Sequence, residues 1–101
     1  MIVHTVMWKL KENAEGNTKE ENAILIKKKL EALYGKIPQI KKIEVGISYR
    51  QEKEDLDVIL ISEFETKREL EEYQSHPVHK IAADFISKVR AERYCVDYSR
   101  P

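Results

Sequence analysis

The pattern of hydrophobic and polar positions divides the chain into four extended segments and two helical regions. Strands are indicated where β-branched and aromatic residues alternate with polar ones or form short apolar runs. The segments that fit are Ile2 to Leu10, Ile43 to Tyr49, Leu56 to Phe64, and Tyr94 to Tyr98. The first and third are apolar on both faces at their centres. The second alternates with polar residues, which predicts one solvated face near a sheet edge.

Helical spacing follows the first strand and precedes the last. The segments Thr18–Glu21 and Thr66–Glu69 each have the sequence of a capping box, which predicts a helix start. Proline is tolerated at the first position of a helix, so His76-Pro77 should end one helix and begin another. The residues predicted to face the core are Ala23, Ile26, Leu30, Leu33, Tyr34, Ile37, Leu70, Tyr73, Val78, Ile81, Ala82, Phe85, Ile86 and Val89.

The order of these elements predicts a fold class. The polar stretches Lys11–Asn17 and Arg50–Asp55 are expected to be a turn and a solvated hairpin connection. The order is then β-α-β-β-α-β, that of the ferredoxin-like fold, which is α+β with a four-stranded antiparallel sheet. Because no linker or low-complexity segment interrupts it, residues 1–101 are expected to form one domain.

This topology leaves one face of the sheet without helices. Its central strands are the first and third along the chain, the two that are apolar on both faces. Val3, Met7, Ile59 and Ile61 would then form an exposed apolar patch. We therefore predict a homodimer in which two copies stack sheet on sheet about a two-fold axis.

The charge composition limits the classes of molecule that the protein is expected to bind. The chain has 18 Lys and Arg against 18 Asp and Glu, a net charge of zero, although 36% of its residues are charged. This balance argues against nucleic acid, and the third strand has aliphatic residues where RNA-recognition modules have exposed aromatics. The lysines around the first helix are interpreted as a solvated face. A neutral or weakly polar small molecule is the ligand we expect.

The apolar runs and the single cysteine indicate the cellular compartment in which the protein is expected. No run approaches the length of a membrane span, and the first residues lack the features of a secretory signal. Cys95 has no second cysteine to pair with, which suits a reducing compartment. We expect a cytoplasmic protein that binds no membrane, with Cys95 as an inert buried thiol beside Arg93.

Four polar residues fall at or beside positions that the periodicity assigns to the core. They are His4, Tyr73, His79 and Asp97. If the helices cover the strand face of Val6 and Trp8, all four converge in one partly apolar pocket. His79 would then be a general base for a proton next to a carbonyl group, and Tyr73 would donate to the developing negative charge. The alternative is that the four side chains only satisfy one another as a buried polar network.

A metal site is another interpretation of the histidines. His76 and His79 have a spacing that can place two imidazoles on one helix face, with Asp97 or His4 as a third ligand. However, His76 precedes Pro77 and is expected at the helix cap, so no metal is predicted. Haem held by His79 is a further alternative. We expect no cofactor.

Three segments resemble the stress-responsive dimeric α/β-barrel (Dabb) domain family. Ile2–Lys11 is similar to its opening strand, Tyr73–His79 to its Y-x-x-H-P-x-H helix junction, and Val96–Tyr98 to its closing strand. Gly46 also fits. The resemblance covers essentially the whole chain and implies a ferredoxin-like fold whose sheets pack into a barrel across a dimer. Most members have no established activity, and some are stress-associated plant proteins.

One type of member, olivetolic acid cyclase, is a cofactor-free enzyme that closes a ring by an aldol reaction. By similarity, His79 would be the catalytic base and Tyr73 its partner. The residues expected to bind the ligand are His4, Val6, Trp8, Leu60 and Asp97. The sequence departs from the cyclase at Val58, where the enzyme has a histidine, and at Ile26 and Leu30, where it has aromatics.

The expected function is thus that of a homodimeric A/B barrel protein that binds a small organic ligand in an apolar pocket. The resemblance leaves three alternatives: a cofactor-independent lyase or polyketide cyclase, a cofactor-free monooxygenase of the related dimeric-barrel type, and a purely structural stress protein.

Overall fold

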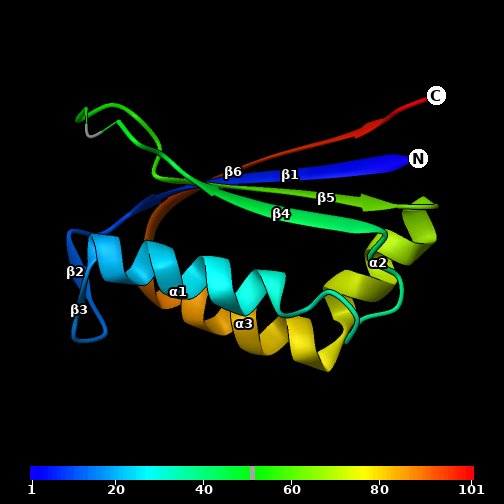
Figure 1. Ribbon diagram of the computed structural model, residues 1–101, viewed down its shortest axis with the longest axis horizontal. Coiled ribbons are helices and arrows are strands. Elements are labelled where there is room, and N and C mark those ends of the chain that lie inside the picture. Colours follow the sequence, from blue (N-terminus) through cyan, green and yellow to red (C-terminus); the bar gives the residue numbers. More distant parts are fainter. Residues whose placement is uncertain (51) are drawn as a thin grey trace.

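The computed structural model describes residues 1–50 and 52–101 and contains the predicted order of elements (Figure 1). The strands of the main sheet are β1 (Ile2–Leu10), β4 (Lys42–Ile47), β5 (Val58–Phe64) and β6 (Arg90–Ser99). The helices are α1 (Lys19–Glu31), α2 (Lys67–Ser75) and α3 (Pro77–Val89). Neighbouring strands are antiparallel in the order β4-β5-β1-β6, so the ferredoxin-like fold is confirmed.

The helices lie on one face of this sheet. Figure 1 shows α1 and α3 side by side beneath it, with α2 at the end where β5 stops. β4 is an edge strand, as its solvated face predicts, and β6 forms the other edge. β6 begins at Arg90 rather than at Tyr94, because its pairing with β1 continues to Leu10. Among the described residues, no helix is long and apolar enough to cross a membrane.

The register of the strands defines two faces. The inner face, toward the helices, carries Ile2, His4, Val6, Trp8 and Leu10 of β1, all of which are buried. The outer face carries Val3, Thr5 and Met7 of β1 with their cross-strand neighbours Ile59, Ile61, Tyr94, Val96 and Tyr98. The hydrophobic core therefore lies between the inner face and the helices.

Val3 differs from the rest of the outer face. It is completely buried although no helix covers it. It lies opposite Glu63 and Tyr98 in the sheet, and the Arg100 guanidinium donates to both side chains, at 3.2 Å and 3.5 Å. The prediction that Val3 needs cover from a second subunit was therefore wrong. The other three residues of the predicted patch are partly exposed.

α1 begins as predicted and ends earlier than its apolar stripe suggests. Thr18 Oγ1 accepts from the N–H of Glu21 at 3.2 Å, and the Glu21 carboxylate accepts from the N–H of Thr18 at 2.9 Å. The helix ends before Gly35, which has a left-handed φ of 85°. Because the chain has already left the helix at Tyr34, this side chain is 58% exposed, and its predicted core position was wrong.

Only half of the second predicted capping box forms. Thr66 Oγ1 accepts from the N–H of Glu69 at 3.1 Å, but the Glu69 carboxylate accepts from the N–H of Glu65 instead of Thr66. His76 separates α2 from α3, as predicted. Its Nδ1 accepts from the N–H of Val78 at 3.1 Å and so caps the start of α3.

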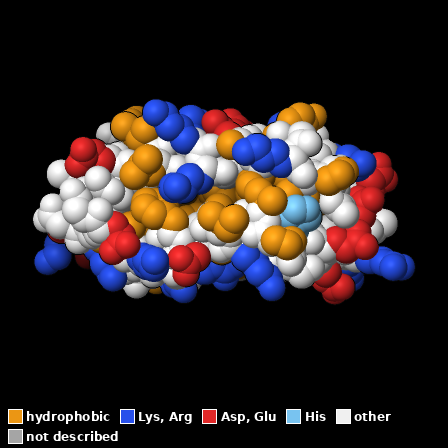
Figure 2. Space-filling model, turned by 90° about the horizontal axis from the view of Figure 1, so that it is seen from below, with side chains coloured by type: hydrophobic (Ala, Val, Ile, Leu, Met, Phe, Trp, Pro, Cys, Tyr) orange, Lys and Arg blue, Asp and Glu red, His pale blue; other side chains and the backbone are white. Residues whose placement is uncertain are grey.

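The predicted apolar stripe of α3 has one clear exception. Ile81 is 71% exposed, whereas Ala82 and Ile86 are buried. The arc of α3 that faces the sheet is narrower than the stripe, so Ile81 instead lines a groove between α3 and α1. Figure 2 looks at this helical side of the molecule and shows hydrophobic side chains interspersed with lysines and arginines.

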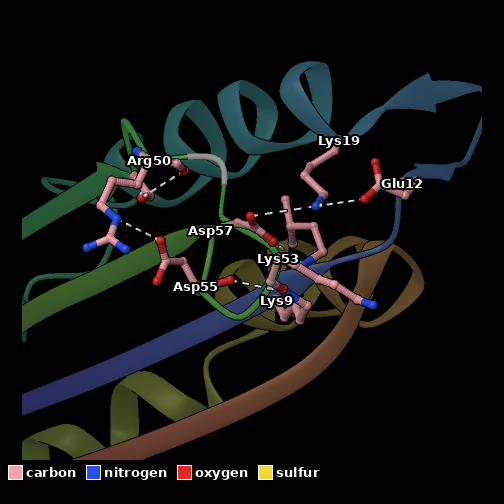
Figure 3. Close-up of polar contacts among 9 residues, drawn as sticks. Lys9, Glu12, Lys19, Arg50, Lys53, Asp55 and Asp57 are labelled. Atoms are coloured by element: carbon pink, nitrogen blue, oxygen red, sulfur yellow. Dashed lines mark hydrogen bonds and ion pairs between the residues drawn. The ribbon is translucent and has the colours of Figure 1, made fainter.

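The connection between β4 and β5 is attached to β1 at the end of the sheet opposite α2 (Figures 1 and 3). Lys9 Nζ donates to the backbone oxygens of Lys53 and Asp55, at 2.6 Å and 3.1 Å. The carboxylate of Asp57 lies 3.7 Å from Lys19 Nζ at the start of α1. These contacts join the connection to both layers of the fold.

Two predicted connections have different outcomes. The polar turn Lys11–Asn17 contains a short hairpin of β2 (Asn13–Ala14) and β3 (Asn17–Thr18), with left-handed φ values of 52° at Glu15 and 77° at Gly16. The predicted connection Arg50–Asp55 includes Gln51, which lies outside the described residues.

Candidate functional site

The register of β1 and β6 brings His4 and Asp97 together on the inner face. The two residues lie directly opposite each other, and the Nδ1–H of His4 donates to Asp97 Oδ1 at 2.5 Å. His4 is only 3% exposed, whereas Asp97 is exposed because β6 is an edge strand. The carboxylate holds a proton of His4 on Nδ1.

Tyr73 projects from α2 into the core beside both imidazoles. Its ring centroid lies 4.4 Å from that of His79, 5.0 Å from that of Phe64 and 6.3 Å from that of His4. The side chain is completely buried, and its hydroxyl has no hydrogen-bond partner among the described residues. Burial raises the pKa of Tyr73, so the phenol stays protonated and is a hydrogen-bond donor.

His79 lies in the first turns of α3, and a backbone contact sets its tautomer. Nδ1 is 3.1 Å from the carbonyl oxygen of Gln74, which can only accept, so Nδ1 carries the proton. Burial lowers the pKa of His79, although the hydrogen bond to Gln74 acts in the opposite direction. Electrostatic interactions with His4, Arg93 and His76 lower this pKa further. The ring is therefore neutral at pH 7, with Nε2 as its basic atom.

The four polar side chains do not satisfy one another as a single network. His4 and Asp97 are paired, but the Tyr73 hydroxyl has no partner among the described residues and His79 is held by a backbone carbonyl. The interpretation as a mutually satisfied network therefore holds for one pair only. The carboxylate of Asp97 lies beside His4 and not beside His79.

A cavity of about 290 Å³ opens between the inner face of the sheet and α3. The predicted site residues on its wall are His4, Val6, Trp8, Leu60 and His79. Tyr73 and Asp97 do not line it. Tyr73 lies against the rings of His79 and His4, and Asp97 lies beyond His4. The inner face of β1 is thus the face that lines the cavity.

Four polar residues of the cavity wall were not predicted from the sequence: Gln74, Ser87, Arg90 and Arg93. Arg93 alternates in step with Asp97 along β6, and this spacing could have placed it on the inner face. Arg90 gives no such signal, because residues three apart point to opposite faces of a regular strand. A register shift at Leu10 puts Arg90 opposite that inner-face residue.

The ligands of the alternative metal site are not gathered together. Among the described residues, the group of potential ligands that lie within 4.8 Å of one another is His4, Cys95 and Asp97, which includes neither His76 nor His79. His76 Nδ1 instead caps α3. The three gathered residues could offer a nitrogen, a thiolate and a carboxylate oxygen. However, the bond between His4 and Asp97 already uses two of these atoms.

Cys95 lies on the inner face but is exposed, so the prediction of a buried thiol was wrong. The reason is its place on an edge strand that the helices do not cover. Partial desolvation and the neighbouring Asp97 carboxylate raise the pKa of the Cys95 thiol, while Arg93 opposes this shift. A raised pKa keeps the thiol protonated at neutral pH, so Cys95 is not an activated nucleophile.

The chain belongs to the family of the stress responsive A/B barrel domain, whose family model matches residues 2–100. It is 32% identical to a dimeric protein of unknown function and ferredoxin-like fold from Bacteroides fragilis NCTC 9343. The match covers 98% of this chain and 95% of that chain, with a TM-score of 0.81. A dimeric ferredoxin-like protein of unknown function from Thermobifida fusca YX is 20% identical over 98% and 90% of the two chains, with a TM-score of 0.82.

The same fold occurs in an oxygenase. A protein described as an antibiotic biosynthesis monooxygenase is 10% identical over 100% of this chain and 99% of that chain, with a TM-score of 0.74. At this identity the likeness shows the fold alone. No curated protein matches the chain.

Proposed function

We propose that the protein is a homodimer that binds a small organic molecule in the cavity between β1 and α3. The observation that carries this is a cavity of about 290 Å³ whose wall combines apolar residues with two imidazoles. Ligand sites typically join an apolar wall to a few convergent polar groups. An engineered cavity of roughly 150 Å³ is large enough for benzene, so this one suits a substituted single ring.

The outer face supports the dimeric part of the proposal. Tyr94, Val96 and Tyr98 of β6 are large apolar or aromatic residues and are exposed on it. A contiguous apolar patch of this kind is typical of an interface. The similar proteins from Bacteroides fragilis and Thermobifida fusca are described as dimeric. We therefore propose that two copies pack through their outer faces.

Ligand binding is tested with Trp8, which lines the cavity and is the only tryptophan of the chain. A panel of small aromatic and β-keto compounds is titrated while the Trp8 fluorescence is recorded, and hits are measured by calorimetry. Ala83→Leu adds volume at the cavity wall and should abolish binding. The matched control is Ala32→Leu, which lies outside this cavity and should bind as wild type does. Equal binding by both variants would argue against the cavity as the site.

Enzymatic activity is a second candidate function, and the state of His79 favours it. Its Nδ1–H is held by Gln74 and its ring is neutral, so Nε2 is free to accept a proton from a carbon next to a carbonyl group. The Tyr73 hydroxyl is a buried donor without a partner among the described residues, and an enolate oxygen would satisfy it. Because Tyr73 does not line the cavity, that oxygen would have to pass the cavity wall to accept from it. This is the chemistry of a cofactor-independent lyase or cyclase.

Proton abstraction is tested by following exchange of the α-hydrogens of ethyl acetoacetate in D₂O by NMR. The protein should accelerate exchange, and His79→Gln should reduce this acceleration by about 100-fold or more. His76→Gln is the matched control, because His76 does not line the cavity. A His79 variant as active as the control contradicts the role of His79 as base. Oxygen uptake in the same assay would indicate monooxygenase chemistry instead.

A further inference from the structure

Two arginines on one side of the cavity differ from the other arginines of the chain. Arg50, Arg68 and Arg100 each form an ion pair with a carboxylate. Arg90 and Arg93 line the cavity, and neither forms an ion pair within the described residues. The charged groups available to a ligand on this side are therefore cationic.

The register shift where β6 pairs with β1 is a β-bulge. It is the reason that both guanidinium groups lie at the same cavity. Arg93 lies opposite Trp8 on the inner face, and regular pairing would place Ala91 opposite Leu10. The register shift places Arg90 there instead. Two cationic side chains three residues apart at the start of β6 are thus directed to one site.

Within the part of the chain that the structure describes, no acidic side chain lines the cavity to balance this charge. The nearest carboxylate of the site, Asp97, is bonded to His4 at 2.5 Å. The remaining polar groups on the wall are neutral or basic: His4, Gln74, His79 and Ser87. The positive charge of Arg93 reaches as far as His79, where it helps to lower the pKa. The local charge of the cavity is positive although the net charge of the chain is zero.

The rest of the wall is apolar. Val6, Trp8 and Leu60 come from the sheet, and Leu30 and Ile86 come from the helices. A ligand that fits such a wall has a hydrophobic body and a negatively charged group at one end. Guanidinium groups match the planar geometry of a carboxylate and bind it through paired, charge-assisted hydrogen bonds.

We infer that the ligand of this cavity is a small organic acid whose carboxylate is bound by Arg90 and Arg93 and whose apolar body lies against Trp8. This inference rests on the proposed function, since it names the class of ligand for the same cavity. It replaces the neutral ligand that the net charge of the sequence suggested. Net charge averages over the whole surface, whereas a ligand responds to the groups within a few ångströms of it.

The experiment compares 4-propylbenzoate with 4-propylbenzamide, which has nearly the same shape and no charge. Affinities are measured by Trp8 fluorescence and by calorimetry. The wild-type protein should bind the acid about ten-fold or more tightly than the amide. Added salt should weaken binding of the acid and leave that of the amide unchanged.

Variants test whether the two arginines cause the preference for the acid over the amide. Arg90→Gln and Arg93→Gln should each reduce the preference for the acid, and the double variant should lose it. Unchanged binding of the amide by these variants shows that the cavity is intact. Arg93→Lys should retain part of the preference, because the charge remains but the paired geometry is lost. The matched control, Arg68→Gln, removes an equal charge from a side chain that is 87% exposed, and should behave as wild type.

The outcomes separate the two proposals. If the amide binds the wild-type protein as tightly as the acid, or if the double variant keeps the preference, the inference about the acid is overturned and the cavity remains a ligand site. If neither compound binds the wild-type protein, the proposed ligand site itself fails, and the inference fails with it.

Discussion

On the inner face of the sheet a histidine is buried with a carboxylate beside it, whereas on the outer face tyrosine and valine side chains are exposed to solvent. His4 on the inner face is almost inaccessible, while Val96, one strand away on the outer face, is 54% exposed. Buried polar groups and exposed apolar patches are the informative exceptions to the usual partition of residues. We propose that one face binds a ligand and that the other binds a second copy of the chain.

The largest expected effect concerns the outer face. Val96→Lys places a charge in the proposed interface and should raise the dimer dissociation constant by about 100-fold or more. Sedimentation velocity over a range of concentrations measures the change. Ile81→Lys is the matched control, because Ile81 is an exposed apolar residue on the helical side. If Ile81→Lys dissociates the dimer and Val96→Lys does not, the interface lies on the helical side, and the proposal that it lies on the outer face is wrong.

The next effect concerns the pair of His4 and Asp97 on the inner face. Asp97→Ala leaves the Nδ1–H of His4 without its acceptor and should lower the free energy of unfolding by about 1–2 kcal/mol. Urea unfolding measures this at pH 7. Asp84→Ala removes an exposed carboxylate 3.3 Å from Lys88 and should cost less than about 0.5 kcal/mol. Equal effects of the two variants would show that the inner-face pair is no stronger than a surface pair.

A smaller effect of opposite sign is expected at Tyr73. Tyr73→Phe removes a buried hydroxyl that has no partner among the described residues, so the free energy of unfolding should stay the same or rise by up to about 1 kcal/mol. The exchange reaction described above should slow, because the donor to the enolate is lost. Tyr34→Phe, at an exposed tyrosine, should change neither quantity. Marked destabilisation by Tyr73→Phe would mean that the hydroxyl is satisfied in the folded protein.

The smallest effect is the pH dependence that His79 adds to stability. Its pKa is lower in the folded protein than its usual value of 6.5, so below that value the unfolded chain binds more protons at this site than the folded one. The stability contribution of neutral His79 is thus complete above about pH 6.5 and is lost as the pH falls through the folded pKa. The midpoint of urea unfolding, measured from pH 7.5 to 5, should fall less steeply for His79→Gln than for wild type. Parallel curves would contradict the lowered pKa.

Much of this arrangement follows from local sequence. The alternation along Ile2–Leu10 predicts which side chains share a face with His4, and the structure has Val6 and Trp8 on that face. His76-Pro77 predicts the break between α2 and α3, which brings His79 close to Tyr73. These features depend on residues two to five positions apart, so the chain carries their signal within a single element.

Other parts of the site depend on contacts between distant residues. Alternation cannot predict that Arg90 joins Arg93 at the cavity, because the bulge that aligns them arises where β6 pairs with β1. It also cannot predict that Asp97 supports His4 instead of His79, since this follows from the register between the first and last strands.

The sequence by itself determined the order of the elements, the two faces of the sheet and the inward orientation of His4, Tyr73 and His79, because periodicity and capping are local properties. Only the tertiary structure decided which of those residues are partners, that Val3 is covered by its own chain, and that the cavity is cationic. The physical reason is that strand register and helix packing are set by the whole fold, and a shift of one residue changes the face to which a side chain points.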